Sequence, residues 1–212
     1  MPLIAPEILH ARLASVRLLD ARQDPAEFAA GHLPGALHAD LNRHLSTASD
    51  PGFDPAHGGR HPLPDPARFA AQLGAWGIGP DTEVVDARRH DSARKVLDVR
   101  TPERYRGDEE TMDPVAGHIP GALSAYWADN LDPNGRFKAP EALRRIYLDL
   151  LDGTSPDQLT VHCGSGVTAR HTLLALEHAG LPGAALYVGS WSEWCRSGRD
   201  LALGSQDGGD HR

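Results

Sequence analysis

The sequence predicts an α/β protein in which a parallel sheet is flanked by helices, built as a tandem repeat with an incomplete first copy. Short apolar strands alternate along the chain with helices of about ten residues, and this alternation indicates parallel βαβ units. The same succession of motifs occurs twice in the same order. Hydrophobic residues make up 40% of the 212 residues and charged residues 24%, which is ordinary for a globular protein.

Each copy of the repeat begins with a short apolar strand that ends in Asp-x-Arg, followed by a short helix and a Gly-His-x-Pro-Gly turn. Proline fixes φ and glycine permits the turn, so the two residues mark a tight connection to the next strand. An amphipathic helix and a further strand follow in both copies. The first copy places these features at residues 18–22, 25–28, 31–36, 66–76 and 82–85, and the second at 96–100, 102–105, 117–122, 140–151 and 159–162.

The two copies end differently. The second continues through a loop at Cys163 into a helix over 169–179, a strand at 184–188 and a terminal helix near 191–196. The first copy stops after Asp86, because only a short polar stretch separates it from the second. We therefore expect three regions, namely a partial N-terminal unit (1–91), a complete C-terminal domain (92–204) and a disordered polar tail (205–212).

Charge and composition exclude several classes of function. The net charge is −8 and no block of lysine and arginine stands out, so a nucleic-acid partner is not expected. No apolar run approaches the roughly 18 residues that a membrane span needs, and the N-terminus lacks the layout of a signal peptide. We therefore expect a cytoplasmic protein with free thiols at Cys163 and Cys195. The histidines lack metal-ligand spacing, so neither a metal nor an organic cofactor is expected.

Cys163 is the strongest candidate for a reactive group. A predicted buried strand ends at this cysteine, a loop with Gly164 and Gly166 follows, and a helix begins directly afterwards. A thiol at the N-terminal end of a helix, among inward-turned backbone amides, has a lowered pKa and favours a bound anion. Cys195 lies in an apolar helical segment without such a loop, and we interpret it as structural or incidental.

Taken together, these motifs resemble the rhodanese superfamily, in particular the two-domain thiosulfate and 3-mercaptopyruvate sulfurtransferases. The resemblance covers nearly the whole chain, including both Asp-x-Arg strands, both Gly-His-x-Pro-Gly turns and residues 105–107 and 189–194. Its sharpest motif is the loop Cys-Gly-Ser-Gly-Val-Thr at 163–168, which is similar to the 3-mercaptopyruvate type. The family has a complete but inactive N-terminal domain, whereas this first unit lacks its final loop, helix and strand.

The resemblance implies a set of catalytic residues. Cys163 would be the nucleophile, and Ser165, His61 and Asp40 would form a Ser-His-Asp arrangement in which the histidine manages a proton. Arg104 would bind the carboxylate or sulfonate of the donor through its guanidinium fork. The loop residues Gly164, Gly166, Val167 and Thr168 would complete the substrate site.

One departure from the family concerns the donor. The resemblance implies a second arginine a few residues beyond Arg104, and none occurs between Gly107 and Gly117. This absence leaves thiosulfate, or another small anionic sulfur donor, open beside 3-mercaptopyruvate. The expected acceptors are cyanide, a small thiol or a protein thiol such as reduced thioredoxin.

Two other functions remain open from the sequence. A Cdc25-like phosphatase or arsenate reductase would share the fold, but its larger loop carries an arginine where this chain has Ala169. A non-catalytic rhodanese-like binding module is the second alternative. The truncated first unit favours such a module, and the intact glycine-lined loop at Cys163 argues against it.

Overall fold

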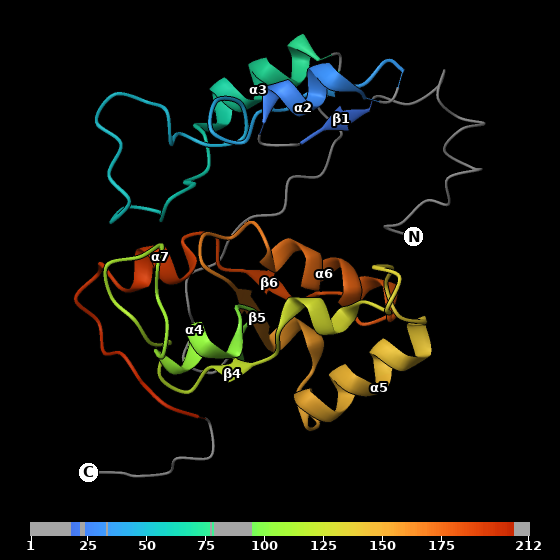
Figure 1. Ribbon diagram of the computed structural model, residues 1–212, viewed down its shortest axis with the longest axis vertical. Helices are drawn as coiled ribbons and strands as arrows, with labels where there is room; N and C mark the ends of the chain where they lie inside the picture. The colour runs from blue at the N-terminus through green and yellow to red at the C-terminus, as the bar shows by residue number, and fades with distance from the viewer. Residues whose placement is uncertain (1–17, 22–23, 33, 77, 79–94, 206–212) are drawn as a thin grey trace. The chain divides into compact units, whose positions relative to one another are not determined.

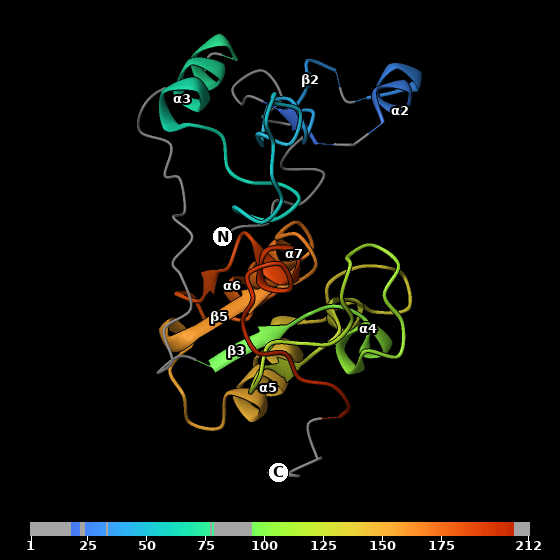
Figure 2. The same ribbon diagram turned by 90° about the vertical axis from the view of Figure 1, so that its left-hand side faces the viewer.

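The computed structural model describes residues 18–21, 24–32, 34–76, 78 and 95–205. The described residues belong to two compact units. The larger unit contains residues 95–205 together with the short segment Pro55–Arg60, and the smaller unit contains residues 18–54 and 61–78. Figures 1 and 2 together label the helices and strands of both.

A parallel sheet forms the centre of the larger unit. Its strands are β3 (Lys95–Asp98), β4 (Leu123–Ser124), β5 (Leu159–His162) and β6 (Ala185–Leu186). They are arranged in the order β4-β3-β5-β6, and every neighbouring pair is parallel. Figure 2 shows β3 and β5 side by side, and in this pair Leu97 lies opposite Val161. The α/β prediction with a parallel sheet is therefore confirmed.

Helices cover both faces of this sheet. They are α4 (Pro102–Arg106), α5 (Pro140–Leu151), α6 (Ala169–His178) and α7 (Ser190–Trp194), with 3₁₀ turns η2 (Trp127–Asn130) and η3 (Pro156–Gln158). Helix α4 illustrates how the sequence sets its ends. The Thr101 hydroxyl accepts a hydrogen bond from the Arg104 N–H, proline occupies the first turn, and Gly107 ends the helix at φ 83°.

Two apolar clusters follow the alternation of side chains along β3. Leu97 packs with residues of α5 and α6 on one face of the sheet. Its neighbour Val96 packs on the other face with Tyr105, Trp191 and Trp194. The side chain of Trp191 is fully buried and Trp194 is nearly so, and both tryptophans therefore pack in the core.

The smaller unit contains the first copy of the repeat. Parallel strands β1 (Leu19–Asp20) and β2 (Leu37–His38) pair with each other, and the helices are α2 (Pro25–Ala30) and α3 (Pro66–Ala75). Aspartates cap both helices, since Asp24 accepts the Ala26 N–H and Asp65 accepts the Ala67 N–H.

Some expectations lie outside the described residues. These are the first copy's last strand at 82–85, the unit boundary at 91 and all of the polar tail 205–212 except Ser205. Among the helices that the structure describes, none has the length and apolar character needed to cross a membrane.

Candidate active site

Cys163 directly follows β5, one of the two inner strands of the four-stranded sheet. Its side chain is only 3% exposed, and the loop 163–168 leads into α6. The strand–cysteine–loop–helix order predicted from the sequence is therefore observed. Because the carboxyl ends of parallel strands form the ligand-binding edge in α/β sheets, the position suits a reactive group.

Ser190 fixes the backbone at Cys163, a role that the sequence did not indicate. The Cys163 N–H donates to Ser190 Oγ over 3.2 Å, and this hydroxyl donates to the Tyr187 carbonyl over 2.8 Å. The Trp191 N–H donates to the Cys163 carbonyl over 3.0 Å. Both backbone polar groups of Cys163 are thus held by the turn that enters α7.

Replacing this hydroxyl is expected to loosen the loop. Ser190→Ala leaves the buried Cys163 N–H without its acceptor, so the free energy of unfolding should fall by about 1–3 kcal/mol. Urea unfolding measures the loss. Ser197→Ala is the matched control, because Ser197 also donates to a carbonyl but is exposed. Equal effects of the two substitutions would contradict the assigned role of Ser190.

The rest of the loop presents backbone amides with unused hydrogen-bonding capacity. Within the described part of the chain, the N–H groups of Gly164 to Thr168 donate to no protein acceptor. Gly166 has φ +80°, and a β-carbon there would lie 2.5 Å from the Val188 carbonyl oxygen, so only glycine fits. Buried donors without an acceptor favour an anion in their place.

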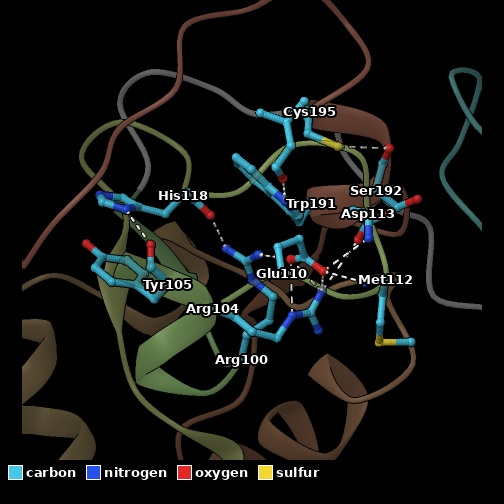
Figure 3. Close-up of polar contacts among 12 residues, drawn as sticks. Arg100, Arg104, Tyr105, Glu110, Met112, Asp113, His118, Trp191, Ser192 and Cys195 are labelled. Atoms are coloured by element: carbon cyan, nitrogen blue, oxygen red, sulfur yellow. Dashed lines mark hydrogen bonds and ion pairs between the residues drawn. The ribbon is translucent and has the colours of Figure 1, made fainter. Parts of the chain in front are cut away.

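Arg104 lies against this loop and is anchored on its other side. Its Nε and Nη2 atoms donate to the buried carboxylate of Glu110, at 2.8 to 3.1 Å (Figure 3). The Glu110 carboxylate also accepts from the Met112 and Asp113 N–H groups. A β-carbon at Gly164 would lie 3.3 Å from Nη1 and 3.5 Å from Nη2 of Arg104, so the end of this guanidinium group faces the loop.

Arg60 brings a second guanidinium group to the same place, from a segment far outside the interval between Gly107 and Gly117. Arg60 belongs to the larger unit, and its Nη1 atom pairs with Asp113 Oδ2 at 2.5 Å. A β-carbon at Gly164 would lie 3.0 Å from its Nη2 atom. The sequence alone could not predict that Arg60 lies near this loop, because more than a hundred residues separate Arg60 from Gly164.

A buried ion pair supports the strand that precedes α4. Arg100 donates to both oxygens of Asp98 at 2.6 to 3.0 Å, and His162 Nε2 lies 3.7 Å from Asp98 Oδ2. Burial alone would raise the pKa of Asp98, but His162 and Arg100 outweigh it and hold the pKa below its usual value. Burial lowers the pKa of His162, which favours its neutral form. This geometry indicates a structural role for Asp98 and Arg100, the Asp-x-Arg residues of the second copy.

The remaining predicted catalytic residues are divided between the units. Ser165 is buried in the loop of the larger unit, whereas Asp40 and His61 belong to the smaller unit. Asp40 Oδ1 accepts hydrogen bonds from the N–H groups of Asn42 and Arg43, at 2.8 and 3.0 Å, as a turn-capping aspartate does. The Ser165–His61–Asp40 arrangement therefore stays a prediction.

The structure gives less support to a reactive Cys195 or to a phosphatase-type loop. Cys195 is partly buried, burial is the main cause that raises its pKa, and its thiol lies 3.7 Å from the Ser192 carbonyl oxygen. Ala169, which occupies the phosphatase arginine position, is completely buried. Thr168 is half-buried and Val167 is exposed at the rim of the loop. The described residues include no group of three or more side chains suited to a metal ion.

Comparison with known proteins agrees with this fold. The Rhodanese-like domain family matches residues 5–74 and 81–197. A Pseudomonas aeruginosa protein described as "Probable 3-mercaptopyruvate sulfurtransferase" is 35% identical, over 91% of this chain and 94% of its own. The human 3-mercaptopyruvate sulfurtransferase is 37% identical over 62% of this chain and 44% of its own.

Solved structures show the same fold at lower identity. The 3-mercaptopyruvate sulfurtransferase from Leishmania major superposes with a TM-score of 0.70 at 21% identity, over 90% of this chain and 73% of that chain. Tum1 from Saccharomyces cerevisiae gives 0.71 at 18% identity, over 97% and 98%. The protein belongs to the rhodanese family, and the predicted rhodanese-like fold is confirmed.

Proposed function

We propose that this rhodanese-family sulfurtransferase moves sulfane sulfur from 3-mercaptopyruvate or thiosulfate to a thiophilic acceptor through a persulfide on Cys163. The observation that carries the proposal is the buried Cys163 at the end of a central strand. Beside it lie two guanidinium groups and a loop whose amides donate to no acceptor among the residues that the structure describes. Such surroundings stabilise a sulfur anion and its anionic donor. The relatives named sulfurtransferases support the same chemistry.

In the first half-reaction the Cys163 thiolate attacks the transferable sulfur of the donor, and a new S–S bond forms. With thiosulfate the old S–S bond breaks, and sulfite leaves with the electron pair. With 3-mercaptopyruvate the C–S bond breaks, and the enolate of pyruvate leaves and then takes up a proton. Amides of the loop from Gly164 to Thr168 hold the resulting persulfide.

In the second half-reaction the acceptor attacks the outer sulfur of the persulfide and releases the Cys163 thiolate. Cyanide takes the sulfur as thiocyanate, and a thiol takes it as a new persulfide. A small thiol or reduced thioredoxin would serve in the cell, and the setting we propose is cytoplasmic. Ser165, His61 and Asp40 are assigned to proton management at the donor, as the resemblance implies.

The proposed organisation is a catalytic domain at 92–204 preceded by a partial unit at 1–91. The alignment with the Pseudomonas protein spans 271 positions, more than the 212 residues of this chain, so it opens gaps within the chain. The first family match is also much shorter than the second. Both observations support the loss of part of the first unit.

A mass measurement tests the proposed intermediate directly. After treatment with either donor and removal of excess reagent, the Cys163 peptide should be heavier by one sulfur atom, and cyanide should reverse the change. The Cys195 peptide provides the internal control and should stay unmodified. A folded protein that acquires no sulfur on Cys163 from either donor would refute the persulfide proposal and favour the non-catalytic binding module.

A further inference from the structure

We infer that the segment Pro55–Arg60, hereafter the strap, is a lid over the Cys163 loop that a protein thiol must displace before it takes up sulfur, whereas small acceptors react with the strap in place. The inference rests on the proposed sulfurtransferase function and concerns its second half-reaction. In that step the acceptor thiolate bonds to the outer sulfur of the persulfide, and Cys163 leaves with the electron pair. The strap would thus select acceptors by their size.

The strap packs with the larger unit, although the chain on both sides of it belongs to the smaller unit. Asp54 and His61, directly before and after it, are both part of the smaller unit. Within the strap the Gly59 N–H donates to the Pro55 carbonyl over 3.1 Å, which closes a turn. Gly58 and Gly59 permit this turn, because they have φ values of 102° and 77°.

Gly59 packs against the backbone turn that holds Cys163. It is buried, and a β-carbon on it would lie 3.0 Å from the carbonyl carbon of Gly189 and nearer still to the carbonyl oxygen. No side chain fits between these backbone atoms. Gly189 directly precedes Ser190, whose hydroxyl accepts the Cys163 N–H. The strap and the reactive cysteine are therefore held by the same turn.

Arg60 extends the contact to the loop itself. A β-carbon on Gly164 would lie 3.0 Å from Arg60 Nη2, so this side chain lies over the residue that follows Cys163. Residues 163–166 are all buried, although they follow a strand at the edge of the sheet where ligands enter in α/β folds. The strap is one of the segments that cover this edge.

This cover affects small and large acceptors differently. Only 3% of Cys163 is exposed, and an acceptor must reach the outer sulfur of a persulfide on this residue. Cyanide or a small thiol needs little space around the sulfur. A cysteine on a protein brings its surrounding surface with it, and this surface cannot approach while the strap covers Gly164. Lids of this kind commonly control access to buried reactive groups.

The contacts that hold the strap suit a segment that lifts and returns. Among the described residues, neither apolar cluster of the larger unit includes a strap residue, and segments with few buried apolar contacts open at low cost. Arg60 Nη1 pairs with Asp113 Oδ2 at 2.5 Å. When the strap lifts, Asp113 Oδ1 keeps its pair with Arg196 at 2.9 Å. Opening therefore leaves this buried carboxylate with a partner.

The test measures how fast a preformed persulfide is discharged. Protein loaded with sulfur from thiosulfate is freed of excess donor, checked by mass for equal loading, and mixed with cyanide or with reduced thioredoxin. Gly59→Ala displaces the strap, because alanine suits neither the positive φ nor the contact with Gly189. The rate constant for thioredoxin should rise about 10-fold or more, since a minor open state is typically populated at about 10% or less. The rate constant for cyanide should stay the same within about 2-fold, because cyanide does not need the open state.

Gly52→Ala is the matched control. Gly52 has φ +81°, close to that of Gly59, but a β-carbon on it would meet no atom of the described residues within 4 Å. The same backbone strain then arises without an obstacle, and both rate constants should match those of the wild type. Folded Gly59→Ala protein without a selective rise for thioredoxin would overturn the inference, as would the same selective rise in Gly52→Ala.

Alkylation of the unloaded thiol keeps the inference distinct from the proposed function. In a Cys195→Ser background, N-ethylmaleimide is compared with a maleimide that carries a long polyethylene glycol chain, each rate being divided by the rate with glutathione. The bulky reagent should be slower at Cys163, and Gly59→Ala should narrow the gap. Asp113→Asn, which removes the charge partner of Arg60, should do the same and serves if Gly59→Ala does not fold.

The outcomes separate the two proposals. Equal relative rates of the two reagents in the wild type, or a gap that neither folded variant narrows, would overturn the inference even in an active protein. A size-dependent gap that Gly59→Ala narrows, in a protein that transfers no sulfur, would support the lid and defeat only the sulfurtransferase proposal.

Discussion

Replacing Cys163 by serine is expected to abolish sulfur transfer from both 3-mercaptopyruvate and thiosulfate. A serine hydroxyl cannot take up sulfane sulfur as a persulfide, and the loss of a covalent nucleophile typically costs on the order of 10⁴-fold or more in rate. The substitution is nearly isosteric at a buried position, so the fold should persist. Thiocyanate formation with cyanide as acceptor, or pyruvate release, measures the loss.

The second cysteine provides the control for this experiment. Cys195→Ser should retain transfer, because its thiol lies beside the Ser192 carbonyl and outside the loop at 163–168. Circular dichroism of both variants establishes that they are folded. Transfer that survives in Cys163→Ser and disappears in Cys195→Ser would reverse the assignment of the nucleophile.

Local sequence signals were sufficient to predict several elements of the larger unit. The strand at 159–162 and the helix at 140–151 occur as predicted, since β-branched or apolar runs and a proline-initiated amphipathic pattern determine them locally. The strand predicted at 184–188 is observed only over Ala185–Leu186. Ends of short elements depend on the partner strand, and the sequence of the element itself contains little information about that partner.

Contacts between distant segments could not be predicted in the same way. Arg60 reaches the loop at Gly164, and Ser190 reaches the Cys163 N–H, through the tertiary fold alone. The family resemblance indicated Arg104, but it did not indicate that Glu110 anchors this arginine. The Gly-Ser pair at 189–190, just beyond the strand predicted at 184–188, was the one signal that could have indicated a turn at Ser190, since glycine and serine are common in turns.

Removing the charge of Asp98 is expected to cause the largest loss of stability. Asp98 and Arg100 are both almost completely buried and make three side-chain hydrogen bonds with each other. Asp98→Asn leaves the Arg100 guanidinium with an uncompensated buried charge at that side. Breaking a buried pair in this way costs about 3–5 kcal/mol, and urea unfolding measures the cost.

An exposed pair of the same spacing is the control. Asp108 pairs with Arg106 at 2.7 Å, but 58% of the Asp108 side chain is exposed, so Asp108→Asn should cost about 0–1 kcal/mol. Similar losses in the two variants would show that burial does not determine the strength of the Asp98 pair, and would contradict the prediction.

The pH dependence of the same variant tests the cause. The pKa of Asp98 in the folded protein lies below its ordinary value of 3.8, because the adjacent His162 imidazole and the charge and hydrogen bonds of Arg100 together outweigh burial. The stability that the charged form contributes is therefore fully present above pH 3.8 and is lost as the pH falls through the folded-state pKa. The gap between wild type and Asp98→Asn should stay constant near neutral pH and close only in acid. A gap that closes between neutral pH and 3.8 would mean that the carboxylate is not held in its charged form by this pair.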